Sequence, residues 1–459
     1  MDNRGESRGS LPCIAAAVVA LLMASAAPGH AFTLIGQPDF LSPGQVWSLP
    51  FTFLGEQVTP RLDVDGFFRV QAVDNQLNNK NVAEIVPEVD LDVNLQITAT
   101  QRIHALFQPI DGGFQKPTAY TIYPGGGWNL RTTRPGGEPA AIWYEGEPLN
   151  WLSPNDRYPL DFYLAAGRFP LTLQNGIFFS NIMDGFAISH DDLQFGTLSN
   201  LNVIYFLSIG QTQGGLTAVT EREQRKQLMG GEFDGDWYDY YFEGDVAAAY
   251  GNGQSLEYPQ DRDRYFWAFS VTRVFRDTAV ALRVLGSTPN YTLGGGELFV
   301  LETGTKIWGT RPYVNIIGGL SNWMPVSQLG SAFANEGILW TFDRLTPFPG
   351  LSPTGANKVG AVSGITFNPA GAVQFTPEIG GQKDNAAFGA NDQAGAGFQI
   401  QADMSRIIKP GNSLRDLITR GLFYGTLLRF TFVGIRNQNT QVSGERFDYG
   451  ERLETIYQF

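Results

Sequence analysis

Apolar and polar residues alternate strictly in several parts of the chain, and the longest example covers residues 88–98. One face of this segment carries only aliphatic side chains, namely Val89, Leu91, Val93, Leu95 and Ile97. Neighbouring side chains of a strand point to opposite faces, so the acidic and amide residues between them share the other face. A strand that crosses a bilayer needs about 9–11 residues. The pattern therefore predicts a strand with one lipid-facing side and one side toward water.

The same alternation recurs along the chain, at residues 61–71, 160–167, 240–250, 265–271, 280–284 and 428–432. In the last of these segments, Arg429 lies between Leu428 and Phe430. An arginine would cost about 2–4 kcal/mol on the lipid face at mid-depth, so its position marks the face toward the interior. These segments predict an all-β fold, a transmembrane antiparallel β-barrel.

The connections between strands suggest the number of strands. Short links are expected at residues 99–101, 235–237, 274–276, 307–310 and 369–371, and long Gly- and Pro-rich segments at 109–137, 321–358 and 380–395. Such barrels have short periplasmic turns and long extracellular loops. Placing every short turn on one side requires an additional strand at residues 138–146. The result is 18 strands, with 16 as the alternative; the links at 191–199 and 407–420 are longer than this scheme expects.

The N-terminus has the features of an export signal. Residues 14–24 form an apolar run behind Arg4 and Arg8, and Gly29-His30-Ala31 supplies small residues for cleavage. The run is too short to cross a bilayer as a helix, which takes about 20 residues. We expect residues 1–31 to be a cleavable signal peptide, residues 32–60 an N-terminal periplasmic lead, and residues 61–459 the barrel.

The C-terminal segment predicts the closing strand of the barrel. Leu453, Thr455, Tyr457 and Phe459 alternate with polar and charged residues, and the sequence stops at the aromatic residue. Together with Gly450, this pattern resembles the signal that the outer-membrane barrel-assembly machinery recognises. Closure of the barrel leaves no free strand edge in the membrane. We therefore expect a bacterial outer-membrane location, with lipid, lipopolysaccharide and the assembly machinery as partners.

Composition supports this class and excludes others. The chain contains 33 Phe, 17 Tyr and 54 Gly, and its one cysteine, Cys13, lies inside the expected signal peptide. After cleavage no disulfide or cysteine-ligated metal is possible. A formal net charge of −13 argues against nucleic acid as a partner.

Charged residues on the predicted inner face are the candidates for lining a pore. They are Asp63, Asp65, Arg69, Glu88, Asp90, Asp92, Glu243, Asp245, Arg283 and Arg429. Charged rings set the ion preference of pores. The acidic row from residues 63–92, opposed by arginines that include Arg61, motivates the hypothesis of a mild cation preference.

Other polar groups are weaker candidates for chemistry. His190 follows Ser189 directly, so the two side chains point to opposite faces and cannot form a catalytic pair. Glu232, Asp234 and Asp236 share one strand face and could bind a divalent cation, but a solvated row is the simpler interpretation. We expect no enzyme, no cofactor and no metal.

Residues 166–189, AGRFPLTLQNGIFFSNIMDGFAIS, resemble large porin-type barrels. The alginate-export and phosphate-selective porin families are the nearest, and the expected 18 strands resemble the alginate-export barrel. A dense basic ladder on the loops, which an anion-selective member would show, is not evident, so no substrate is inferred from the resemblance.

These features predict a porin or channel for passive diffusion or facilitated transport of small polar solutes or ions. A long loop, residues 109–137 or 321–358, would narrow the pore. The alternative is a structural barrel, either a sheath around a periplasmic partner such as an electron-transfer cytochrome, or a surface adhesin.

Overall fold

The computed structural model describes most of the strand-forming part of the chain. The described residues are 32–35, 51–53, 56–58, 60–77, 80–98, 100–109, 119–123, 127–131, 139–148, 162–212, 227–250, 263–288, 295–328, 333, 336–340, 348–352, 357–385, 391–407, 426–439 and 444–458. Phe459 of the expected assembly signal and the whole of the expected signal peptide lie outside these ranges.

Eighteen strands form the wall. They are β4 (Arg61–Leu77), β5 (Lys80–Gln96), β6 (Gln101–Phe107), β9 (Ala141–Gly146), β10 (Phe162–Leu173), β11 (Phe179–Phe195), β12 (Leu198–Thr212), β13 (Gln227–Trp237), β14 (Tyr240–Tyr250), β15 (Arg264–Phe275), β16 (Thr278–Ser287), β17 (Gly296–Thr305), β18 (Thr310–Ser321), β20 (Lys358–Phe367), β21 (Val373–Asp384), β22 (Asn391–Asp403), β23 (Thr426–Asn439) and β24 (Gly444–Gln458).

Six further strands and three short helices lie beside or within the wall. They are β1 (Phe32–Ile35), β2 (Phe51–Phe53), β3 (Glu56–Val58), β7 (Ala119–Tyr123), β8 (Gly127–Arg131), β19 (Ser327–Gln328), the 3-10 helices η2 (Gln174–Gly176) and η3 (Ile338–Trp340), and α2 (Met404–Ile407). Within the described ranges, no helix is long and apolar enough to cross a membrane.

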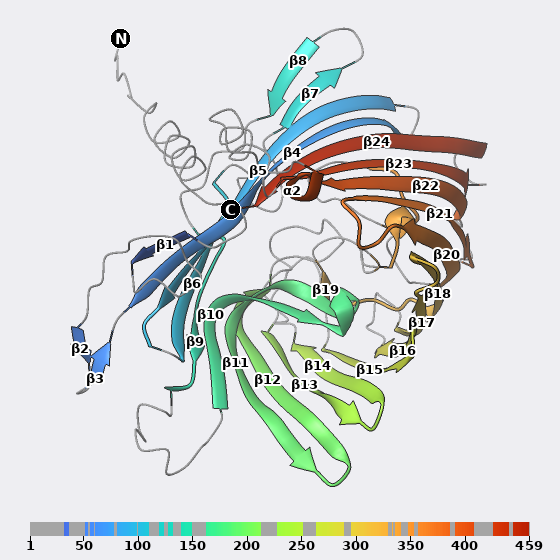
Figure 1. Ribbon diagram of the computed structural model, residues 1–459. Helices are drawn as coiled ribbons and strands as arrows, with labels where there is room; N and C mark the ends of the chain where they lie inside the picture. The colour runs from blue at the N-terminus through green and yellow to red at the C-terminus, as the bar shows by residue number, and fades with distance from the viewer. Residues whose placement is uncertain are drawn as a thin grey trace, which may run out of the picture.

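The wall closes into an antiparallel ring (Figure 1). β24 pairs with β4, where Leu453 lies opposite Ala72, and β9 joins β6 to β10. The expected strand at residues 138–146 is β9, and it is needed for closure. The all-β class, the antiparallel barrel and the count of 18 strands are confirmed. Closure pairs the edge strands that would otherwise expose unpaired backbone groups.

Three features of the connections differ from the expectation. The link at residues 191–199 is a two-residue turn, because β11 continues to Phe195 and β12 begins at Leu198. Gly196 in that turn has φ +63, a conformation that glycine adopts without steric cost. The turn expected at 235–237 lies at 238–239, since β13 extends through Trp237. A two-residue link also joins β4 to β5, at the end of the barrel where long loops were expected.

The expectation of a loop at residues 380–395 was wrong. Most of it belongs to β21 and β22, and Gly380 lies directly opposite Gly395 in the paired strands. A Cβ on Gly380 would lie 2.6 Å from the carbonyl oxygen of Ala361, and one on Gly395 would lie 2.4 Å from Cδ1 of Ile435. These glycines therefore allow close approach inside the sheet.

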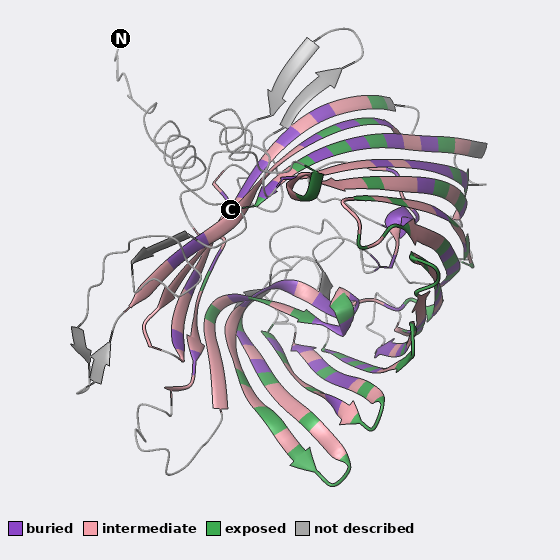
Figure 2. Ribbon diagram, in the orientation of Figure 1, coloured by how far each residue is buried: buried purple, intermediate pink, exposed green. Residues whose placement is uncertain are grey.

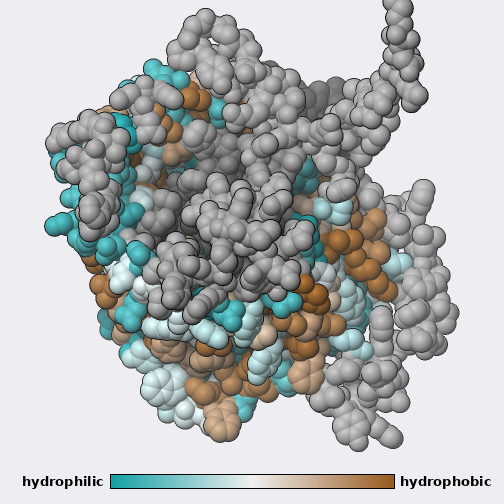
Figure 3. Space-filling view, turned by 180° about the vertical axis from the view of Figure 1, so that it is seen from behind, coloured by the Kyte–Doolittle hydropathy of each residue, from teal (hydrophilic) through white to brown (hydrophobic). Residues whose placement is uncertain are grey.

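Solvent exposure alternates from one residue to the next along the wall strands, because successive side chains point to opposite faces. On β15, Tyr265, Trp267 and Phe269 are 40–53% exposed, whereas Phe266 and Ser270, on the other face, are nearly inaccessible. Figure 2 shows buried and exposed residues alternating along the wall strands. Figure 3, a view from behind, shows many hydrophobic side chains on the lower part of this face, among residues of intermediate hydropathy. The outer face is therefore predominantly apolar, as a lipid-facing surface must be.

The two segments expected to narrow the interior lie in different places. Within residues 109–137, β7 pairs with β8 and with β5, and Figure 1 shows this hairpin projecting away from the ring. The segment between β18 and β20 instead enters the ring. Its strand β19 pairs in parallel with β11, with Ser327 opposite Phe179, although β11 and β18 lie seven strands apart along the wall order.

Candidate functional site

The inner face carries buried polar side chains from most of the wall. Examples from separate strands are Gln71, Asp245, Arg283, Glu378 and Glu454, each less than 10% exposed. Contacts with η2 and η3 involve this same face, so it is the interior of the ring. Buried charges are costly unless they are paired or hydrogen-bonded, so their partners determine how the interior is organised.

The predicted acidic row on β4 and β5 lies on the inner face, but it is interleaved with arginines. Arg61 Nε lies 2.8 Å from a carboxylate oxygen of Asp63, and Arg69 lies 2.5 Å from Glu88. Asp65 is paired in register with Asp92. The expected opposition of this row to Arg61 and Arg69 across the barrel was therefore wrong: both arginines belong to β4 itself and neutralise their neighbours.

Asp92 of the predicted row lies near His104 of β6, and Asp90 lies two positions earlier on the same face of β5. The imidazole Nδ1 of His104 is 3.9 Å from Asp92, and Nε2 is 3.3 Å from Glu145 of β9. The ring of His104 stacks on Trp143, with centroids 4.7 Å apart. His190 is separate from this group, since its ring contacts Phe162 edge-on.

Glu454 of β24 is the centre of a group of arginines. Its carboxylate lies 3.5 Å from Arg69, 3.6 Å from Arg429 and 3.4 Å from Arg452, and it accepts a hydrogen bond from Gln71. Glu454 is 1% exposed. Arg429, one of the predicted residues, is thus on the inner face as expected, with a counter-charge from the neighbouring strand.

A second group forms around Gln174 in η2, the bend between β10 and β11. The backbone N–H of Gln174 donates to Glu243 at 2.7 Å, and its side-chain amide donates to Asp245 at 2.6 Å. Arg283 donates to the amide oxygen of Gln174 at 3.1 Å and forms an ion pair of 2.9 Å with Glu302. Three predicted residues, Glu243, Asp245 and Arg283, therefore converge on one bend of the chain.

Glu336, from the segment between β18 and β20, joins this second group. The side chain of Asn175 lies 3.4 Å from Glu302 and 3.5 Å from Glu336, and Asn315 donates to the backbone carbonyl of Glu336 at 2.6 Å. Burial raises the pKa of Glu336 well above its ordinary value, and the adjacent carboxylate of Glu302 raises it further. Glu336 is therefore protonated more readily than an exposed carboxyl group, which favours the close approach of the two side chains.

Glu378 of β21 anchors the same segment to the wall a second time, two strands beyond β18. Its carboxylate accepts hydrogen bonds from the backbone N–H groups of Ile338 at 3.0 Å and Leu339 at 2.7 Å, and from the hydroxyl of Tyr313. The N–H groups at the start of a short helix have no partners within the helix. One buried carboxylate thus caps η3 and holds it on the inner face.

An apolar cluster packs between the wall and two segments inside the ring, the bend that contains η2 and the segment between β18 and β20. It includes Ile177, Phe178 and Phe179 after η2, Trp323, Phe333, Leu339, Trp340 and Leu351 from the segment between β18 and β20, and Leu285, Leu298, Val300 and Ile317 on the wall. Most of these side chains are less than 3% exposed. Apolar burial of this kind stabilises by about 1.5–3 kcal/mol for each large side chain.

Several residues of these networks were not predicted from the sequence, above all Gln174, Glu302, Glu336, Glu378 and Glu454. The parity of β17 and β24 would have placed Glu302 and Glu454 on the inner face. The parity of β21 would likewise have placed Glu378 on the inner face. Gln174 and Glu336 could not have been found in that way, because they belong to segments that fold back into the ring.

The residues of the expected assembly signal that are described lie in β24. Leu453 is 50% exposed and faces outward, and Tyr457 has the same parity. Gly450 faces inward, where a Cβ would lie 2.5 Å from Cδ of Pro349. Gly450 therefore also provides room for the inserted segment.

Solved structures that resemble this fold are porins of Pseudomonas. One is Pseudomonas aeruginosa OccK2 (OpdF) in complex with glucuronate, with a TM-score of 0.54 and 12% identity over 87% of this chain and 98% of that one. Another is Pseudomonas aeruginosa OpdK with vanillate, with a TM-score of 0.55 and 10% identity over 87% and 98%. A BenF-like porin from Pseudomonas fluorescens Pf-5 has a TM-score of 0.53 and 13% identity over the same shares.

These likenesses confirm the porin-type architecture, and they do not single out the alginate-export or phosphate-selective families. At such identities the similarity shows the fold alone. No protein-family model matches the sequence, and no curated protein shows significant similarity to it.

Proposed function

We propose that the chain is a bacterial outer-membrane channel through which small polar solutes pass without energy coupling. The observation that carries this proposal is a closed ring of 18 strands with an apolar outer face and charged groups along its inner face. The structures with glucuronate and vanillate that share this fold support small carboxylates as the first solutes to test.

Single-channel recording of the purified, refolded protein in planar bilayers tests the proposal. Stable conductance steps are expected, and the size of the steps should fall when a permeating carboxylate occupies the pore. Persistent silence, with correct folding shown by circular dichroism, would instead favour the structural barrel around a periplasmic partner. Reversal potentials under a salt gradient test the hypothesis of mild cation preference, and clear anion selectivity would contradict it.

The expected division of the chain is part of the proposal: a signal peptide at residues 1–31, a periplasmic lead at 32–60 and the barrel from residue 61. Lipid, lipopolysaccharide and the barrel-assembly machinery are the proposed partners.

The intact mass of the exported protein tests the expected cleavage. It should correspond to a chain that begins at Phe32, and a mass that retains the first 31 residues would refute cleavage. The short resemblance of residues 166–189 keeps the alginate-export and phosphate-selective porins as the nearest families in this proposal, without assigning a substrate.

Leu282→Arg tests the lipid-facing side of the wall. Leu282 is 51% exposed near the middle of β16, whereas the adjacent Arg283 faces inward. We expect the substitution to lower the free energy of unfolding in lipid vesicles by about 2–4 kcal/mol, because a guanidinium would then lie in hydrocarbon. Urea unfolding measures the loss, with Leu282→Val as the apolar control. Equal stability of the arginine and valine variants would show that this face does not contact lipid.

A further inference from the structure

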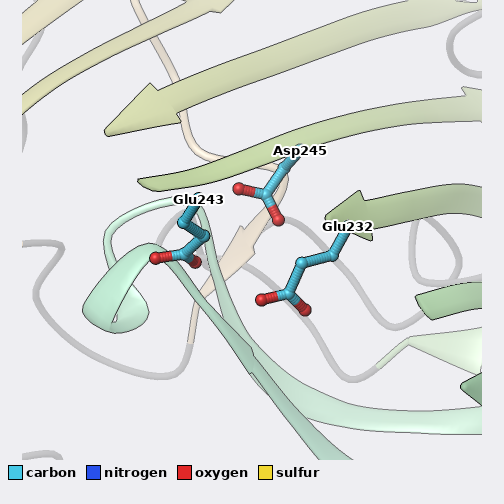
Figure 4. Close-up of side chains that lie close together, drawn as sticks. All are labelled: Glu232, Glu243 and Asp245. Carbon is cyan, nitrogen blue, oxygen red and sulfur yellow. The ribbon is translucent and has the colours of Figure 1, made fainter. Parts of the chain in front are cut away.

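Three carboxylates from two neighbouring strands converge on one space of the inner face. They belong to Glu232 of β13 and to Glu243 and Asp245 of β14, and an oxygen of each lies within 4.8 Å of the other two (Figure 4). Glu232 lies directly opposite Asp245 in the paired strands, as Asp234 lies opposite Glu243. Like charges at directly opposed positions destabilise a sheet, so this arrangement needs compensation.

The protein groups nearby compensate only part of this charge. Arg283 lies 3.7 Å from Glu243, but its closer contact, at 2.9 Å, is with Glu302. Gln174 donates its backbone N–H to Glu243 and its side-chain amide to Oδ2 of Asp245. One guanidinium is therefore shared between Glu243 and Glu302, and among the described residues it forms no ion pair with Glu232 or Asp245.

One oxygen atom in this cluster of carboxylates is evidence for a bound ligand. Oδ1 of Asp245 is buried and has no hydrogen-bond partner in the described protein, although the residue is only 2% exposed. Ser270, which is paired in register with Glu243, is 1% exposed, and its hydroxyl is likewise without a partner there. A buried carboxylate oxygen without a donor is costly, and a bound cation would remove that cost.

We infer that Glu232, Glu243 and Asp245 bind a divalent cation through carboxylate oxygens, and that Ca²⁺ fits this site best. Ca²⁺ binds oxygens at about 2.3–2.6 Å in flexible geometry, so its ligands can lie up to about 5 Å apart. Mg²⁺ requires bonds of about 2.0–2.1 Å in a near-ideal octahedron, which would draw the three oxygens closer together. The inference does not require that the barrel conduct.

The ion would have a structural effect beyond its ligands. Glu243 and Asp245 are also the acceptors of Gln174, so the cation would stabilise the contact between β14 and η2. It would thereby strengthen the attachment of the bend after β10 to the wall. A ligand that binds only the folded state raises its stability.

Thermal unfolding of the full-length protein in detergent micelles tests the site. We expect Ca²⁺ added after chelation to raise the unfolding midpoint by several degrees, and an equal concentration of Mg²⁺ to have a smaller effect. Glu232→Gln and Asp245→Asn should abolish the shift. Asp277→Asn removes one negative charge from an exposed turn and is the matched control, so it should retain the full shift.

Equilibrium dialysis with radioactive Ca²⁺ measures binding directly, without reference to the unfolding midpoint. One tightly bound ion per chain, lost in Asp245→Asn, supports the inference. Absence of bound Ca²⁺ at neutral pH, with the same unfolding midpoint in Ca²⁺ and in chelator, would overturn it and would mean that protons neutralise the cluster. Retention of the shift in both ligand variants would also overturn it.

Discussion

Glu378→Ala will detach η3 from the inner wall and raise the single-channel conductance several-fold. Glu378 is 2% exposed and holds the backbone N–H groups of Ile338 and Leu339. Its removal leaves two buried donors without their acceptor and the hydroxyl of Tyr313 without its partner, at a cost of about 3 kcal/mol or more. The inserted segment then loses its polar anchor, and the interior widens where that segment crosses it.

The measurement combines planar-bilayer conductance with limited proteolysis of the folded protein. Glu378→Gln is the conservative comparison, because its amide oxygen still accepts one hydrogen bond, and an intermediate conductance is expected. Glu297→Ala removes an exposed carboxylate near the end of β17 and should leave both readouts unchanged. A conductance in Glu378→Ala equal to that of the unsubstituted protein, in a correctly folded barrel, would show that the segment does not limit permeation.

The wall of this protein could be predicted because strand parity is a local property. The alternation at residues 88–98 and at 240–250 matches β5 and β14, since each strand must present one apolar and one polar face wherever it lies in the ring. The expected strand at residues 138–146 followed from the placement of the turns alone. Its observed counterpart, β9, shows that a topological constraint can identify a strand whose own pattern is weak.

The errors have a different physical origin. Glycine was taken as a sign of loops at residues 380–395, whereas Gly380 and Gly395 serve a close approach between neighbouring strands. The link placed at residues 191–199 was too long, because β11 continues through Leu193 to Phe195 and only the turn at Gly196 separates it from β12. Composition does not distinguish these uses of glycine, because they differ in the distance between backbones rather than in sequence.

The interior was harder to predict than the wall because it is assembled from distant segments. Leu298 and Val300 occupy inner positions that should be polar in a water-filled barrel, and they are buried beneath the inserted segment. An apolar run on both faces of a strand, as at residues 298–301, indicates that another segment of the chain packs on the inner face. Which segment does so could not be inferred, because its position depends on contacts such as that between Glu378 and η3.

Glu454→Gln will destabilise the closing strand and shift ion selectivity toward anions. Arg69 keeps Glu88 at 2.5 Å in this variant, whereas Arg429 loses the carboxylate 3.6 Å away. Arg452, only 3% exposed, keeps its contact with the ring of Phe348 but loses its ion pair with Glu454. Breaking a buried pair by removing one partner costs about 3–5 kcal/mol, because the other charge remains buried.

Urea unfolding and reversal potentials under a salt gradient measure the two effects. Glu451→Gln makes the same change of charge three positions earlier on β24, on an exposed position of the opposite face, and should affect neither. Unchanged stability and selectivity in Glu454→Gln would show that Glu454 does not balance the arginines.

A double variant separates the charge from the packing. Arg452→Met combined with Glu454→Gln removes both members of one buried pair while keeping most of the side-chain volume. It should recover part of the stability lost in Glu454→Gln, since replacing a buried ion pair costs less than leaving one member unpaired. The anion shift should also become smaller, because one inner positive charge has been removed. If the double variant is less stable than Glu454→Gln alone, Arg452 contributes mainly through its stacking on Phe348.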